Sequence, residues 1–61
     1  MINQYDVVES LINIPEENLY IGDEGTVVED FDDNYCMVEF YKKIHQFLKQ
    51  LTLPPLCIKK I

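Results

Sequence analysis

The chain has 61 residues, eleven carboxylates, five lysines, one histidine and a formal net charge of −6 at pH 7. Hydrophobic residues make up 48% of it and only two residues are glycine, which excludes a disordered acidic tail. The length allows one domain, whose core contributes roughly 3–5 kcal/mol of net stability at best. We therefore expect residues 1–61 to form a single small globular domain.

The charges are divided along the chain. Every carboxylate lies between Asp6 and Glu39, and every basic residue lies between Lys42 and Lys60. A net anionic surface repels polyanions over about a Debye length of 8–10 Å and hastens association with basic proteins, although solubility alone also explains such a charge. The asymmetry argues against nucleic-acid binding and favours a protein partner with a basic surface.

The compartment is predicted from the cysteines and the first residues. The segment Met-Ile-Asn-Gln-Tyr-Asp lacks the charged and apolar regions of a secretory signal. Two cysteines, Cys36 and Cys57, are fewer than small disulfide-stabilised secreted domains usually carry. We expect a cytoplasmic protein with reduced, buried thiols. No apolar run approaches the roughly 18 residues of a membrane span, so no membrane association is expected.

The first strand is predicted at residues 5–11, which are β-branched in the middle. Residues 12–22 contain a proline and two glutamates and predict an ordered loop. Three apolar side chains of this loop are expected to contact the core: Ile14, Leu19 and Ile21.

A turn and a hairpin follow. Residues 22–25 (Gly-Asp-Glu-Gly) predict a turn, because glycine adopts positive φ at little cost. Residues 26–31 and 35–41 predict paired strands, and the polar residues 32–34 suit the hairpin tip. Alternation in the second strand predicts one face with Cys36, Val38 and Phe40 and another with Tyr35, Met37, Glu39 and Tyr41. The four tyrosines are expected to lie half-buried at the edges of the core.

Residues 41–53 fit two structures. Apolar residues recur at helical spacing and favour a helix slightly, which Pro54 and Pro55 would end. The alternative is a strand at 47–53 after a turn near 42–45. A short final strand is predicted at residues 56–61, with Pro55 and the lysines protecting its edge.

Metal binding is not predicted. Asp30, Asp32 and Asn34 begin like a calcium loop, but tyrosines stand at positions 35 and 41, where glycine and a bidentate glutamate are needed. Three further residues could supply zinc ligands, yet they lack the close cysteine pairs of zinc sites in short chains; they are Cys36, His45 and Cys57.

Catalysis and nucleotide binding are not predicted either. The Gly22–Gly25 spacing matches a loop that clamps nucleotide backbones, but Asp23 and Glu24 would repel phosphate. A domain this small rarely forms a pocket of about 300–1,000 Å³. We therefore expect no enzyme, no cofactor and no metal.

Four segments carry a family resemblance: Tyr5-Asp-Val-Val-Glu9, residues 14–29, Tyr35-x-x-Val-Glu-Phe40 and Leu51-Thr-Leu53. They resemble a family of small bacterial domains of unknown function that is well represented in cyanobacteria. The resemblance implies a mainly β fold, a small five-stranded SH3-like (KOW-like) barrel. It therefore favours strand over helix at 47–53; the alternative is an α+β fold with a helix at about 41–53. Genes of the family often lie beside a small toxin-like protein, which implies an antitoxin or immunity role.

The leading hypothesis is a non-enzymatic acidic module that binds a basic protein. Its predicted contacts are the acids of the glycine turn and of the hairpin tip: Asp23, Glu24, Asp30, Asp32 and Asp33. A second hypothesis is a small structural subunit of a larger complex, with which homo-oligomerisation is compatible. A third is a KOW-type nucleic-acid binder whose lysines form one basic edge: Lys42, Lys43, Lys49, Lys59 and Lys60.

Overall fold

The computed structural model describes residues 2–31, 34–42 and 47–61, without the side chains of residues 42, 47 and 48. These residues form strands and two short 3-10 helices, and no α-helix is found among them. The elements in chain order are β1 (Val7–Ser10), η1 (Pro15–Glu17), β2 (Glu24–Phe31), β3 (Tyr35–Lys42), β4 (Phe47–Leu53), η2 (Pro55–Cys57) and β5 (Ile58–Lys60).

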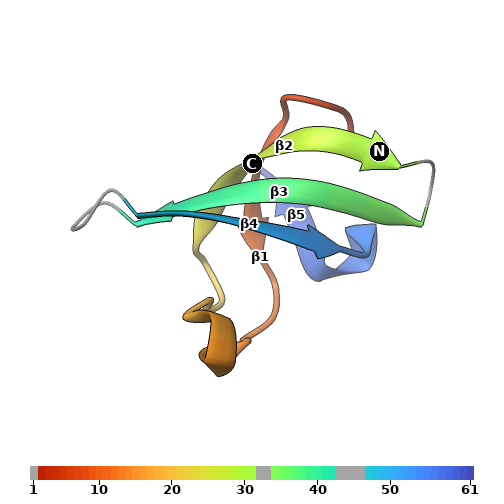
Figure 1. The fold of residues 1–61 in the computed structure, drawn as a ribbon. Coiled ribbons are helices and arrows are strands. Elements are labelled where there is room, and N and C mark those ends of the chain that lie inside the picture. The colour runs from red at the N-terminus through yellow and green to blue at the C-terminus, as the bar shows by residue number, and fades with distance from the viewer. Residues whose placement is uncertain (1, 32–33, 43–46) are drawn as a thin grey trace.

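All five strands belong to one antiparallel sheet with the order β4-β3-β2-β1-β5. Strands β4 and β5 stand at the two ends of this order and do not pair with each other, so the sheet is open. In Figure 1, β1 runs across β3 and β4 rather than along them, which shows how strongly the sheet bends. The prediction of a mainly β fold is confirmed.

The alternative of a helix at 41–53 is wrong wherever the structure describes this segment. Strand β3 continues through Lys42, and residues 47–53 form β4 in unbroken register with β3. Pairing places Leu51 and Leu53 opposite Val38 and Cys36, so burial against the sheet overrides the local helical spacing. The predicted turn at 42–45 falls largely on residues 43–46, which lie outside the described residues.

Three predicted strand boundaries differ from those in the structure. Strand β1 starts only at Val7, because Tyr5 adopts a left-handed conformation (φ 72°). Residues 55–57 form η2, so the final strand is shorter than predicted. Strand β2 begins at Glu24, and Gly25 is therefore a buried strand residue rather than the end of a turn.

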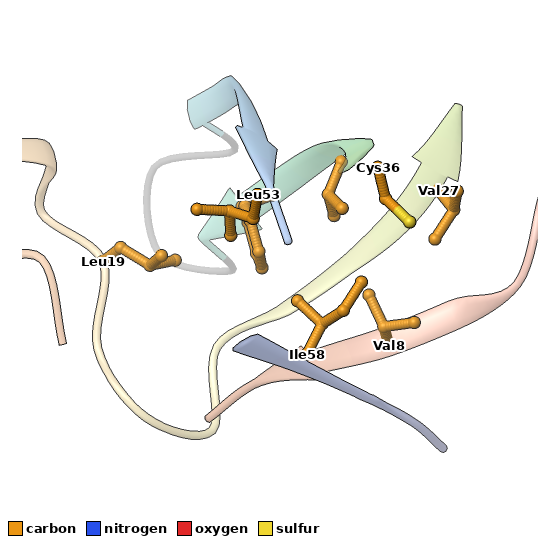
Figure 2. Close-up of a cluster of buried hydrophobic side chains, with 8 residues drawn as sticks. Val8, Leu19, Val27, Cys36, Leu53 and Ile58 are labelled. Carbon is orange, nitrogen blue, oxygen red and sulfur yellow. The ribbon is translucent and has the colours of Figure 1, made fainter. Parts of the chain in front are cut away.

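The core lies on one side of the bent sheet. Its members are at most 7% exposed: Val8, Leu19, Val27, Cys36, Val38, Phe40, Leu53 and Ile58. Figure 2 shows Val8 and Ile58, from β1 and β5, facing the side chains that come from β3 and β4. The predicted alternation of residues 35–41 is confirmed for its core face, since Cys36, Val38 and Phe40 are all buried.

The loop between β1 and β2 supplies one core residue. Leu19 is 1% exposed and pairs with Ile14 through a β-bridge, while Asn18 ends η1 in the left-handed conformation. Ile14 is partly buried against the core, as predicted. The prediction for Ile21 is wrong, because its side chain is 62% exposed.

Replacing Gly25 by alanine is expected to destabilise the fold by about 1–3 kcal/mol. A Cβ atom there would lie 2.6 Å from the carbonyl oxygen of Glu39 and 2.8 Å from a methyl carbon of Val38. Gly22→Ala is the matched control, because its Cβ would meet open space and the cost is only the strain at φ +94°, about 1–2 kcal/mol. Urea denaturation should give a lower midpoint for Gly25→Ala than for Gly22→Ala. Equal midpoints would contradict the close approach of β2 and β3.

Candidate functional site

The predicted acidic contacts do not form one surface. Glu24 opens β2 and Asp30 stands near its other end, six residues and about 20 Å away. The register with β3 also shifts between Val27 and Glu29, so that Val28 is an extra residue. Asp30 consequently pairs with the buried Cys36 and faces the core side, whereas Glu24 faces the outer side. Asp32 and Asp33 lie outside the described residues.

Asp23 holds the turn that leads into β2. Its carboxylate oxygen Oδ2 accepts a hydrogen bond from the Tyr20 backbone N–H at 2.9 Å, and its own N–H donates to the Tyr20 carbonyl at 3.0 Å. The Asp23 carbonyl accepts from Ser10 N–H at 2.8 Å, and Gly22 N–H donates to the Ser10 carbonyl at 2.9 Å. This network fixes the turn to the end of β1, and Asp23 therefore has a structural role.

Four large apolar side chains are exposed around this turn. We call them the turn patch: Leu11 (43% exposed), Tyr20 (44%), Ile21 (62%) and Leu56 (91%). Leu11 N–H donates to the Cys57 carbonyl at 2.8 Å, which brings η2 beside the end of β1. The Gly22–Ser10 hydrogen bond brings the residue after Ile21 to the same place. Apolar side chains that stay exposed on neighbouring segments of a folded domain make these segments a candidate interaction site.

Carboxylates border the turn patch. Glu24 directly follows Asp23 and is exposed, and the sheet register places Glu9 of β1 directly opposite it. Like charges directly opposite each other destabilise an antiparallel pair. Lys59 of β5 lies on the other side of Glu9 and offsets part of this repulsion. We call Glu9, Asp23 and Glu24 the acidic rim.

The turn patch and Glu9 were missed by reasoning from the sequence alone. The sequence predicts Leu11 in the first strand, Ile21 against the core and Leu56 in the final strand, and none of these predictions indicates an exposed patch. The patch exists because the chain around Leu11 meets η2, and no local pattern encodes that meeting. The prediction of half-buried tyrosines is confirmed for Tyr20 and Tyr35, which are 44% and 51% exposed, and is wrong for Tyr5, which is 72% exposed.

A second exposed pair lies at the β2–β3 hairpin. Phe31 and Tyr35 are cross-strand neighbours, 44% and 51% exposed, and Asp30 precedes them. This pair is at the far end of β2 from Glu24 and is thus separate from the turn patch.

Two lysines on the edge strands β4 and β5 form ion pairs within the chain. Lys49 belongs to β4 and its Nζ lies 2.9 Å from Oε1 of Glu17 in η1. Lys60 belongs to β5 and its Nζ lies 3.7 Å from Oδ1 of Asp6. These ion pairs tie the cationic C-terminal strands to the acidic first half of the chain.

The two cysteines differ in burial. Cys36 is 1% exposed, and burial together with the negative charge of Asp30 raises the pKa of its thiol. Cys57 is partly buried against the core. A raised pKa keeps the thiol protonated at neutral pH, which is the opposite of an activated nucleophile.

Histidine, cysteine and carboxylate side chains do not gather in threes, as a metal ion would require, anywhere in residues 2–31, 34–42 and 47–61. His45, considered as a zinc ligand, lies outside these ranges. Neither 3-10 helix in the described part of the chain is long or apolar enough to cross a bilayer.

The comparisons with known proteins agree with this picture of a small domain. The model of a domain of unknown function (DUF4926) matches residues 4–59. The chain therefore belongs to the DUF4926 family, and the predicted resemblance to a family of unknown function is confirmed at that level. No curated protein and no solved structure matches the chain.

Removing the Asp23 carboxylate should lower stability by roughly 1 kcal/mol, because the Tyr20 N–H loses its acceptor. Asp23→Asn keeps a side-chain oxygen at the same place and should stay within about 0.5 kcal/mol of the wild type. Thermal unfolding of the Asp23→Ala and Asp23→Asn variants compares the two. Equal losses would show that the charge of Asp23, rather than its hydrogen bond, stabilises the turn.

Cys57 should react with iodoacetamide before Cys36 in the folded protein at neutral pH. Burial both hides the Cys36 thiol and raises its pKa, so little thiolate is available. In the Cys57→Ser variant, Cys36 is the remaining thiol, so mass spectrometry measures the labelling of Cys36 alone. This labelling should accelerate strongly in urea. A Cys36 labelling rate that is the same with and without urea would contradict its burial.

Proposed function

We propose that this chain is a non-enzymatic protein-binding module that holds a basic partner through the turn patch and the acidic rim. The observation that carries the proposal is that two opposed carboxylates, Glu9 and Glu24, stand at the end of β1 where backbone hydrogen bonds gather the segments of the exposed Leu11, Ile21 and Leu56. An apolar centre bordered by charge is the usual anatomy of a protein interface.

The parts of this surface have different roles. Desolvation of Leu56 and Ile21 supplies affinity, because these side chains leave water on binding. The acidic rim steers a cationic partner and speeds association more than it deepens affinity. Asp30, Asp32 and Asp33 are proposed as a second steering surface at the other end of β2.

The fold is assigned to the SH3-like barrels as part of the same proposal. The strand order β4-β3-β2-β1-β5 supports it, as does the 3-10 helix η2 between the last two strands. The bulge at Val28 lets β2 bend and serve two parts of one sheet. In this assignment the open gap lies between β4 and β5.

The biological role that fits best is an antitoxin or immunity protein of the bacterial cytoplasm, with its basic partner encoded in a neighbouring gene. Its support is the family resemblance together with the net charge of −6. A structural subunit of a larger complex is the second candidate, favoured by the 91% exposure of Leu56. Nucleic-acid binding has less support, because Lys49 and Lys60 are each paired with a carboxylate of the same chain.

The partner should be captured from a lysate of the native host by the tagged wild type, and lost with Leu56→Ser. Kinetics with the captured protein then test the roles. Replacing Glu9 and Glu24 by glutamine should slow association roughly tenfold at low salt and flatten its salt dependence. Ile21→Ala should mainly speed dissociation.

Replacing Glu29 and Glu39 by glutamine is the matched control, since it removes the same charge from the outer face of β2 and β3. Its association rate should stay closer to that of the wild type. Equal slowing by both pairs would show that net charge alone acts and that the acidic rim is not the contact. Tight binding of an oligonucleotide that weakens with salt would instead favour a nucleic-acid binder.

A further inference from the structure

We propose that the edge of β4 pairs with β4 of a second copy and forms a closed two-fold dimer. Strand β4 stands at one end of the sheet and has β3 as its strand neighbour in the described part of the chain. An edge strand presents unpaired backbone groups that favour pairing with another strand unless the edge is protected.

The two edges of the sheet differ in protection. Strand β5 has three residues, two of which are lysines, and prolines precede it. Strand β4 has seven residues and contains neither proline nor glycine. Its register with β3 runs without a bulge from Phe47 to Leu53. Of the two edges, β4 is therefore the one prepared for a partner strand.

Geometry selects the register of an antiparallel β4–β4 pair. Side chains alternate between the faces, so a slip of one residue would place core-side residues of one copy beside outer-side residues of the other. Among registers that keep the faces matched, the one centred on Gln50 pairs all seven residues. It places Lys49 opposite Leu51 of the second copy and Gln50 opposite its own equivalent.

The local charge permits this contact despite a net charge of −6. Strand β4 contains no carboxylate, and the charge of Lys49 is paired with Glu17 of its own chain. The nearest carboxylate across the strands is Glu39, opposite Gln50 on β3. The two Glu39 residues would be three strand spacings apart, about 14 Å, which exceeds the Debye length of about 8–10 Å. Repulsion at this edge is therefore weak.

The residue at the axis suits a second copy in particular. Gln50 is exposed, and its amide carries both donors and an acceptor, so two copies can hydrogen-bond to each other. One strand pair is smaller than the roughly 1,200–2,000 Å² of stable complexes. The dimer is thus reversible and depends on concentration. It also stops at two chains, because pairing occupies β4 in both copies.

Sedimentation equilibrium of the full chain, from low micromolar to millimolar concentration, tests the dimer. The weight-average mass should rise from that of the monomer and level off at twice that value. Gln50→Lys places two lysines at the axis and should keep the protein monomeric, while Glu39 on β3 offers the new lysine an intrachain partner. Gln4→Lys adds the same charge beside β2 and is the matched control, which should dimerise like the wild type.

A charge-swap pair separates this contact from loss of folding. Gln50→Glu alone should also be monomeric, and an equimolar mixture with Gln50→Lys should recover the dimer mass. Circular dichroism confirms that each variant is folded. A wild type that stays monomeric throughout overturns the proposal and leaves β4 to a strand of another protein. A mass that climbs beyond two chains, or a mixture that stays monomeric, overturns it as well.

Discussion

The close approach at Gly25 is the contact on which the rest of the sheet depends. Gly25 pairs with Val8 of β1 on one side and with Phe40 of β3 on the other. A Cβ atom at this position would come within 3.0 Å of three atoms of β3 residues. Because Gly25 has no side chain, β2 can pair closely with β1 on one side and with β3 on the other. Val8 of β1 and Val38 of β3 therefore pack in the same core. A side chain at Gly25 would therefore push β2 and β3 apart beside the buried Val38 and Phe40.

The packing of this sheet determines where polar and charged side chains are placed. The interior holds apolar side chains and the hydroxyl of Ser10, which is fully buried and donates to the Ile12 carbonyl at 2.7 Å. None of the described Asp, Glu or Lys side chains is buried in this interior, and several of them stand at the ends of strands. The turn patch arises at one such end, where the loop after β1 and the helix η2 meet. The proposed binding surface therefore consists of side chains outside the core.

The sequence predicted the elements whose signal is local. Alternation in residues 35–41 identified the buried face of β3, and the apolar residues 14 and 19 identified the anchored part of the loop. The bulge at Val28 was not predictable, because Val27, Val28 and Glu29 continue a plausible strand whichever face they occupy. The helical spacing of residues 47–53 misled for a related reason: pairing with β3 decides their structure. The candidate site shared this limit, since contacts between Leu11 and η2 join residues far apart in the chain.

The division of charge along the chain has a structural use as well as a functional one. The edge strands β4 and β5 carry three of the five lysines, each beside a carboxylate: Lys49 beside Glu17, Lys60 beside Asp6 and Lys59 opposite Glu9. Such partly exposed pairs contribute little individually, about 0–1 kcal/mol. They do, however, favour the return of β4 and β5 to the acidic first half of the chain. Glu9 and Glu24 nevertheless stand directly opposite each other, with Lys59 on the far side of Glu9, so the fold leaves part of their repulsion uncompensated.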